Sequence, residues 1–205
     1  MMKNGNRILM VLTLVALLSA AGCGGRQVYR MDEEDQAPDL SGRWNSVDSE
    51  QVSEALEYQI TEAAWWEDFR SANGRSPYLI IGSIYNKTSD HIPVKTFISD
   101  FERAFINGGK VRMVASPEER EAIRTERADQ QEHASEATMS RWGREHGADY
   151  MLIGEINQIY DAADDAEVFY YQVDCYLVDL EDNVKVWAGY ERIKKFAGSK
   201  APKGY

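Results

Sequence analysis

The sequence contains few of the residues that carry catalysis or metal binding. Of its 205 residues three are His and two are Cys, and it has no His-Glu-x-x-His pair and no Gly-x-Ser-x-Gly turn. Gly108-Gly109-Lys110 lacks the glycine spacing and the following Ser or Thr of a phosphate loop, so it indicates a helix end. The sequence therefore favours a protein with no catalytic residues, no cofactor and no metal site. Its many carboxylates leave an enzyme as an open alternative.

Basic residues are also scarce. The chain has 23 Lys and Arg against 34 Asp and Glu, a net charge of −11. Such an excess of acid argues against a nucleic-acid partner and against charge-driven docking onto anionic lipid headgroups. It is compatible with a protein partner that carries a basic patch.

Long apolar runs are absent, with one short exception near the N-terminus. The stretch from Ile8 to Leu18 has 11 positions and is broken only by Thr13, and Lys3 and Arg7 precede it. A helix that spans a bilayer needs about 20 apolar residues. The pattern is instead typical of a secretory signal peptide, which we predict over residues 1–22.

The end of this segment is similar to a bacterial lipobox. Small residues at positions 20–22 lead directly to Cys23, although Ala20 stands where such signals usually have Leu. The resemblance implies that Cys23 becomes the lipidated (palmitate-bearing) first residue of the mature chain. Because Gly24 rather than Asp follows, known sorting signals imply the outer membrane, facing the periplasm. The alternative is an ordinary secretory signal cut near Ala21, with Cys23 a free thiol.

The mature chain should form one domain behind a short tether. Removal of residues 1–22 takes away two basic residues and no acidic ones, which makes the net charge −13. Residues 23–38 are polar and contain an acidic run, so we predict a flexible tether that reaches at most about 50 Å. We expect a globular domain over 39–196 and a loose tail over 197–205. Cys175 alternates with apolar residues in a strand pattern, which predicts a small core residue.

Hydrophobic periodicity predicts an α/β fold. The expected fold is a single domain with a mixed, mostly antiparallel sheet of four to five strands flanked by helices. Asp48 and Gln51 suggest a capping box for a helix that runs to about Arg70. The other expected elements are helices over 93–107, from 116 onward and over 135–146, and strands over 78–85, 110–115, 149–160, 168–180 and 184–194.

A row of arginines is the strongest candidate for a partner-binding site. Arg120, Arg124 and Arg127 fall on one side of a mostly polar helix. Like charges at this spacing repel by about 0.2–0.5 kcal/mol per pair, so they need an offsetting interaction. That offset is either pairing with local carboxylates such as Glu121 or contact with a partner. Trp65 and Trp66 have similar alternatives: one ring in the core and one half-exposed, or a ligand-stacking pair.

Several stretches, taken in order, resemble the LpoB family of lipoproteins. They cover nearly the whole chain from Leu40 onward with few gaps: Leu40-Ser41-Gly42-Arg43-Trp44-Asn45, Asn86-Lys87-Thr88, Phe101-Glu102-Arg103-Ala104-Phe105-Ile106-Asn107, Gly109-Lys110-Val111, Glu119-Arg120, Arg124, Glu126-Arg127, Ala134-Ser135-Glu136, Gly147-Ala148-Asp149, Tyr170-Tyr171-Gln172-Val173-Asp174 and Lys194-Lys195.

This resemblance implies a small α/β sandwich related to the N-terminal domain of TolB and to the globular part of CsgG. It also implies an activator that docks on a class A penicillin-binding protein and stimulates peptidoglycan synthesis. The tether is shorter and has fewer prolines than in the best-known members. A CsgG-like part of an outer-membrane secretion or surface-assembly system is the alternative, although the strand over 168–180 carries Gln172 and Asp174, which suit a soluble sheet better.

Overall fold

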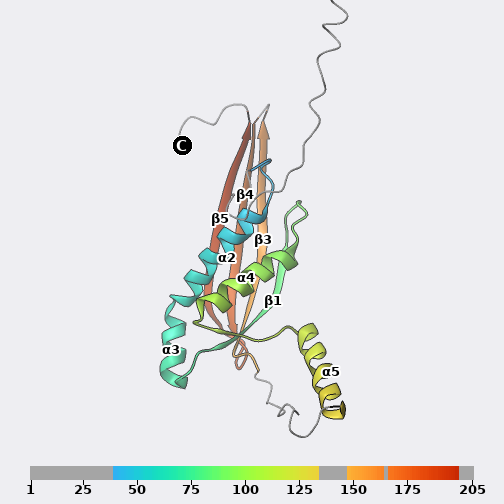
Figure 1. Ribbon diagram of the computed structural model, residues 1–205. Helices are drawn as coiled ribbons and strands as arrows, with labels where there is room; N and C mark the ends of the chain where they lie inside the picture. The colour runs from blue at the N-terminus through green and yellow to red at the C-terminus, as the bar shows by residue number, and fades with distance from the viewer. Residues whose placement is uncertain (1–38, 134–146, 164–165, 199–205) are drawn as a thin grey trace, which may run out of the picture. The chain divides into compact units, whose positions relative to one another are not determined.

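The computed structural model describes residues 39–133, 147–163 and 166–198 (Figure 1). All of them belong to Ala37–Tyr205, the second of the two units into which the chain divides. The predicted signal peptide, Cys23, the tether, the helix over 135–146 and residues 199–205 lie outside the described residues.

The first described helix, α2 (Ser46–Thr61), begins three residues earlier than the sequence pattern predicted. The predicted capping box of Asp48 with Gln51 is wrong, because the N-cap is Asn45 and Asp48 is its third helical residue. Asn45 Oδ1 accepts from the N–H groups of Val47 and Asp48, and Asp48 Oδ2 accepts from the Asn45 N–H. The two side chains thereby satisfy free N–H groups at the helix start reciprocally.

The long helix predicted to run to about Arg70 is in fact two helices. α2 ends at Thr61, and α3 covers Ala64–Asn73 after an extended residue, Ala63. The break turns Trp65 and Phe69 toward the Tyr150 ring, with ring centroids 5.0 and 5.6 Å apart. These edge-to-face contacts and the bond from Trp65 Nε1 to the Ile60 carbonyl (2.8 Å) stabilise the reversal. Gly74, at φ 64°, ends α3.

The sheet confirms the predicted α/β class and is more evenly mixed than expected. Its five strands lie in the order β2-β1-β3-β4-β5. β1 pairs in parallel with β2 and β3, whereas β3, β4 and β5 form an antiparallel meander. The strands are β1 (Tyr78–Asn86), β2 (Arg112–Met113), β3 (Tyr150–Ala163), β4 (Ala166–Asp179) and β5 (Lys185–Gly198). β2 is much shorter than the strand predicted over 110–115, and β5 extends two residues past the predicted end of the domain.

The helices that pack on the sheet share one of its faces. α2 packs against β5, and α4 (Val94–Gly108) packs against β1 and β2 (Figure 1). Phe97, Phe101 and Phe105 of α4 are fully buried, and burying a side chain of this kind contributes about 1.5–3 kcal/mol. We call the opposite face of the sheet, on which neither α2 nor α4 packs, the uncovered face.

The last described helix is α5 (Pro117–His133). It begins as predicted, because Ser116 and Glu119 exchange side-chain to backbone hydrogen bonds. Most of its described side chains are exposed. In the described part of the chain, none of the helices has the length and apolar character needed to span a membrane.

Candidate functional site

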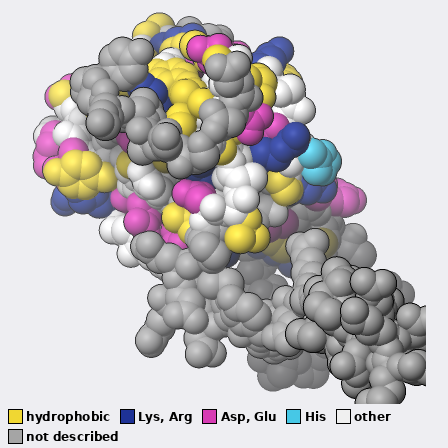
Figure 2. Space-filling view, turned by 90° about the horizontal axis from the view of Figure 1, so that it is seen from above, with side chains coloured by type: hydrophobic (Ala, Val, Ile, Leu, Met, Phe, Trp, Pro, Cys, Tyr) yellow, Lys and Arg dark blue, Asp and Glu magenta, His cyan; other side chains and the backbone are white. Residues whose placement is uncertain are grey.

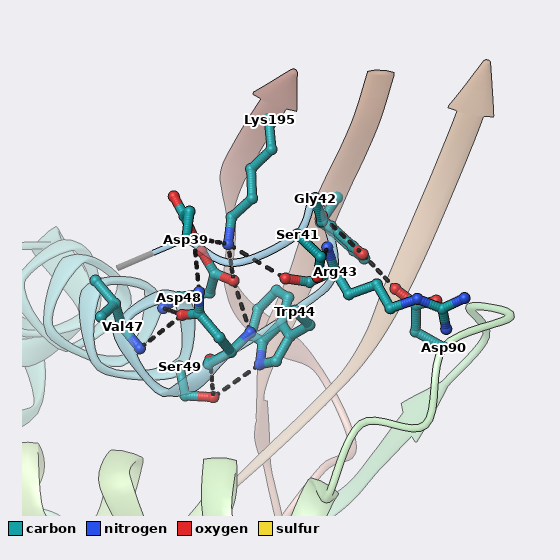
Figure 3. Close-up of polar contacts among 12 residues, drawn as sticks. Asp39, Ser41, Gly42, Arg43, Trp44, Val47, Asp48, Ser49, Asp90 and Lys195 are labelled. Atoms are coloured by element: carbon teal, nitrogen blue, oxygen red, sulfur yellow. Dashed lines mark hydrogen bonds and ion pairs between the residues drawn. The ribbon is translucent and has the colours of Figure 1, made fainter. Parts of the chain in front are cut away.

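The lead-in to the domain, Asp39–Asn45, is fastened to β5 by one lysine (Figure 3). Lys195 Nζ donates to Asp39 Oδ1 at 2.7 Å and to Asp48 Oδ2 at 2.6 Å, and its side chain is only 9% exposed. The hydrogen bond from Lys195 holds the pKa of Asp39 below its usual value. The Lys195 ammonium group, shared by two carboxylates, therefore joins the lead-in and α2 to β5.

A second contact ties the lead-in to the loop after β1. Arg43 Nη1 donates to Asp90 Oδ1 at 3.3 Å, and Asp90 also accepts from Gln158 and Tyr171. Burial and the hydrogen bond to Asp90 raise the pKa of Tyr171 well above its usual value. A pocket of about 420 Å³ lies at this corner, but its polar groups are bonded to one another. These bonds indicate that the residues around Asp90 hold the lead-in and the loop together and do not form a ligand site. Figure 2 shows the molecule from above, where hydrophobic, basic and acidic side chains are interspersed on the surface.

The uncovered face of the sheet is the larger candidate for contact with a partner. Strand register places alternate residues of β3, β4 and β5 on it in rows. One row contains Glu155, Asp174 and Tyr190, and the row beside it contains Asn157, Gln172 and Arg192.

These polar side chains hold one another in fixed positions. Asn157 Nδ2 donates to Glu155 at 3.0 Å and to Asp174 at 3.3 Å. Gln172 Nε2 donates to Asp174 at 2.7 Å, and Gln172 Oε1 accepts from Arg192 Nε at 3.0 Å. Side chains that are already ordered lose less conformational entropy when a partner binds, so this network is preorganised for a protein contact.

Aromatic side chains border the polar network. Tyr85 and Tyr190 are 59% and 49% exposed, and Ile159 is 67% exposed. Arg192 lies over the Tyr190 ring at 4.2 Å, and Lys185 over the Tyr176 ring at 3.7 Å. A pocket of about 330 Å³ on this face is lined in part by Tyr85, Ile153 and Tyr176. Tyr and Arg are the residues enriched at the centres of protein interfaces.

The three predicted arginines lie on α5 but do not all meet at one place. Arg120 and Arg127 line a pocket of about 210 Å³ with Met113 and Ile123, and Arg120 Nε is buried without a hydrogen-bond partner among the described residues. Arg124 pairs with Glu121 at 3.6 Å, in agreement with the local-pairing alternative. The role of Arg120, Arg124 and Arg127 in binding a partner stays a prediction.

The remaining candidates have structural explanations. Trp65 is buried and Trp66 is half-buried, as the first alternative predicted, and each indole N–H donates to a backbone carbonyl. Cys175 is fully buried in β4, and burial raises its thiol pKa to about 12. A thiol with that pKa is a poor nucleophile. Among the residues that the structure describes, no cluster of His, Cys, Asp or Glu could hold a metal ion.

The comparison with protein families decides the classification. The sequence matches the family described as peptidoglycan-synthase activator LpoB over residues 48–193, which is more than half of the chain. The chain belongs to the LpoB family. The matched range contains α4, most of α2 and most of the sheet, so the greater part of the described fold lies within the family match.

Solved structures of LpoB domains are among those similar to this chain. The LpoB C-terminal domain from Escherichia coli is 17% identical, with 72% of this chain and 99% of that chain covered and a TM-score of 0.40. The corresponding domain from Salmonella enterica is 16% identical, with the same coverage and a TM-score of 0.38. Lipoprotein GNA1162 from Neisseria meningitidis is 16% identical, with 60% and 84% covered and a TM-score of 0.39. A search among curated proteins gave no match.

The stretches that resemble LpoB sequences come together in the fold. Leu40–Asn45, the loop after Asn86, Tyr171 and Lys195 all meet at the end of the sheet where the lead-in lies. Neither Lys195 nor the uncovered face was predicted from the sequence as a functional site. The alternation of Tyr170, Gln172, Asp174 and Tyr176 along one strand was a usable signal, because a polar and aromatic row on one side of a strand predicts an accessible face.

Proposed function

We propose that this LpoB-family protein is an outer-membrane lipoprotein, attached through lipid at Cys23 and facing the periplasm. In this proposal it binds a class A penicillin-binding protein and activates it in peptidoglycan synthesis. The observation that carries the proposal is the match to the peptidoglycan-synthase activator family over residues 48–193. The lipobox-like sequence that ends at Cys23 supports the anchor.

The proposed mechanism is binding that favours one state of the synthase. A protein that binds the active conformation more tightly than the inactive one shifts the population toward activity. A tenfold shift requires a difference in binding free energy of about 1.4 kcal/mol between the two states. This mechanism requires a firm protein surface and no reactive side chain of the activator itself.

We assign the main contact to the uncovered face. It combines exposed aromatic rings with a polar network that is already hydrogen-bonded, and α2 and α4 pack on the other side of the sheet. The arginines of α5, which are Arg120, Arg124 and Arg127, form a proposed second contact. Their positive charge stands out on a chain of net charge −11.

Affinity capture from detergent-solubilised envelopes tests the partner and the surface together. The full-length chain, tagged at its C-terminus, should recover a class A penicillin-binding protein. The double variant Tyr85→Ser/Ile159→Ser removes two exposed apolar side chains from the uncovered face and should reduce recovery roughly tenfold. Tyr58→Ser is the matched control, because Tyr58 is 66% exposed but lies on α2.

The outcomes separate the proposal from its alternatives. Equal recovery by the double variant and the control would move the contact away from the uncovered face without removing the synthase as partner. Recovery of outer-membrane secretion proteins alone would overturn the partner assignment. The anchor is tested by growth with radiolabelled palmitate, which should label the wild type and the Cys175→Ser variant but not the Cys23→Ser variant.

A further inference from the structure

β5, which is 14 residues long, is an edge strand of the sheet (Figure 1). An outer strand presents backbone N–H and C=O groups on the side where no neighbouring strand pairs with them. Successive residues of a strand direct these groups alternately to its two sides. Only every second residue of β5 therefore has backbone groups that face away from β4.

The hydrogen bonds around the β4–β5 turn identify those residues. The Asp179 N–H donates to the Val184 carbonyl at 2.8 Å, so odd-numbered residues of β4 face β5. The Leu180 N–H donates to the Asp149 carbonyl at 3.0 Å, so even-numbered residues face β3. A register shift separates the pairs Leu177–Trp187 and Val178–Lys185, but beyond it β4 and β5 pair odd with odd, as in Tyr171 with Ile193. The even-numbered residues of β5 from Ala188 onward therefore face outward. The Gln59 side chain, which reaches the Tyr190 carbonyl at 3.3 Å, agrees with this assignment.

Gln59 bonds to the outer side of β5 at Tyr190. No other described residue is seen to bond to the outward backbone groups that follow. The outward backbone groups beyond Tyr190 belong to Arg192, Lys194 and Phe196. We call this stretch the β5 edge. Arg192 and Lys194 are exposed, and their side chains lie on the uncovered face.

The charges of the β5 edge decide what can pair with it. None of the outward residues is acidic, on a chain whose net charge is −11. If a second copy paired antiparallel through the same edge, with the β5 edge of one copy directly against that of the other, Arg192 of each copy would lie opposite Lys194 of its partner. Like charges directly across two strands are destabilising. An extended segment with acidic side chains would meet complementary charge at the same positions.

We propose that the β5 edge is a strand-addition site for an extended acidic segment of a partner protein. The backbone of the segment would continue the sheet beyond β5 and bond to the N–H and C=O groups of Arg192, Lys194 and Phe196. Its alternate acidic side chains would lie beside Arg192 and Lys194 on the uncovered face. Main-chain bonds give such a site its affinity, and the basic side chains give it selectivity for acid.

Titration of the full-length chain in detergent micelles with synthetic peptides tests the charge requirement. A short peptide in which Glu alternates with Val should bind, and the matching peptide in which Ser alternates with Val should bind roughly tenfold more weakly. Binding should also weaken as salt is raised, because the charges are exposed. Equal binding of the two peptides would overturn the selectivity for acid.

Backbone methylation tests strand addition itself. A Glu-Val peptide that is N-methylated at alternate residues keeps its side chains and loses its hydrogen bonds along one edge. One of the two possible methylation registers should abolish binding, while the other should leave it within about twofold of the parent peptide. If both registers bind like the parent, the contact is made by side chains only and the proposal is wrong.

Amide hydrogen exchange locates the contact on the protein. In the free chain the amides of Arg192, Lys194 and Phe196 should exchange fast, and those of Glu191, Ile193 and Lys195 should exchange slowly. The Glu-Val peptide should slow the first set. Slow exchange of the first set before any peptide is added would show that the edge is already covered, which contradicts the proposal.

Charge variants complete the test. Lys194→Glu should weaken binding of the Glu-Val peptide roughly tenfold. The Lys194 side chain makes no described contact whose loss would unfold the domain. Lys95→Glu, on an exposed position of α4, should leave binding unchanged. Because the probes are peptides of defined sequence, this result does not depend on whether a penicillin-binding protein is the partner of the whole protein.

Discussion

Lys195 connects parts of the chain that are far apart in sequence. It bonds Asp39 and Asp48 at once, across more than 140 residues of chain. Nothing in the local sequence predicts such a bond, because Lys194 and Lys195 are adjacent, identical in type and part of the same strand. Only the register of β5 decides that Lys194 is exposed and that Lys195 lies under the lead-in.

We predict that Lys195→Met destabilises the domain by about 3 kcal/mol, because it leaves the carboxylate of Asp48 buried without its cation. Urea unfolding of the variant measures this loss. Lys194→Met, one residue away and exposed, should change the free energy of unfolding by no more than about 0.5 kcal/mol. Similar losses for the two variants would show that Lys195 has no special role.

Asp149 makes the stability of the domain depend on pH. Burial by itself would raise the pKa of Asp149. Hydrogen bonds from Arg75 Nη1 and Nη2, both at 2.8 Å, and from the Tyr78 N–H instead hold that pKa below its usual value of 3.8. A carboxylate with a lowered folded-state pKa stabilises the fold above its unfolded-state pKa. That stabilisation is lost as the pH falls through the folded-state pKa.

Asp149→Asn should therefore cost about 1 kcal/mol at pH 7, since the pair is partly exposed, and the difference from wild type should shrink as the pH is lowered below about 4. Denaturant unfolding at a series of pH values measures both. Asp68→Asn, an exposed residue of α3, is the control and should show no such change. A difference that stays constant with pH would contradict the assigned role.

At the scale of elements, strong periodicity gave reliable predictions, whereas capping residues predicted the start of α5 correctly and the start of α2 wrongly. The apolar run that predicted a strand over 78–85 and the phenylalanine spacing that predicted a helix over 93–107 correspond closely to β1 and α4. The break between α2 and α3 was missed, because the residues around Ala63 continue a helical pattern in sequence. The contact that favours the break is with Tyr150, which lies in a distant strand.

α5 carries the arginines that the sequence predicted for a partner. Charge reversal at Arg124 alone should have little effect on partner binding, because Arg124 pairs with Glu121 at an exposed position. Reversal of Arg120, Arg124 and Arg127 together should weaken capture of the synthase without lowering the unfolding free energy by more than about 1 kcal/mol. Unchanged capture by the triple variant would show that this row is solvated surface.

At the scale of the whole molecule, the family and the fold class could be predicted from sequence, whereas the arrangement of the candidate surfaces could not. The ordered stretches from Leu40 to Lys195 carried the family resemblance, and the family match confirms it. The uncovered face and the β5 edge depend on strand order and on which face the helices cover. Both are set by contacts between distant elements, so the alternation along β4 indicates an accessible face but not which strand forms the edge or which face the helices cover.

The central claim is that this protein activates a peptidoglycan synthase by binding to it. The most direct measurement is the rate of glycan polymerisation by a purified class A penicillin-binding protein in detergent micelles, with and without the full-length chain. We expect the rate to rise severalfold and to saturate as the chain is added, and we expect no polymer from the chain alone. An unchanged rate at concentrations where the two proteins are shown to be bound would contradict the claim.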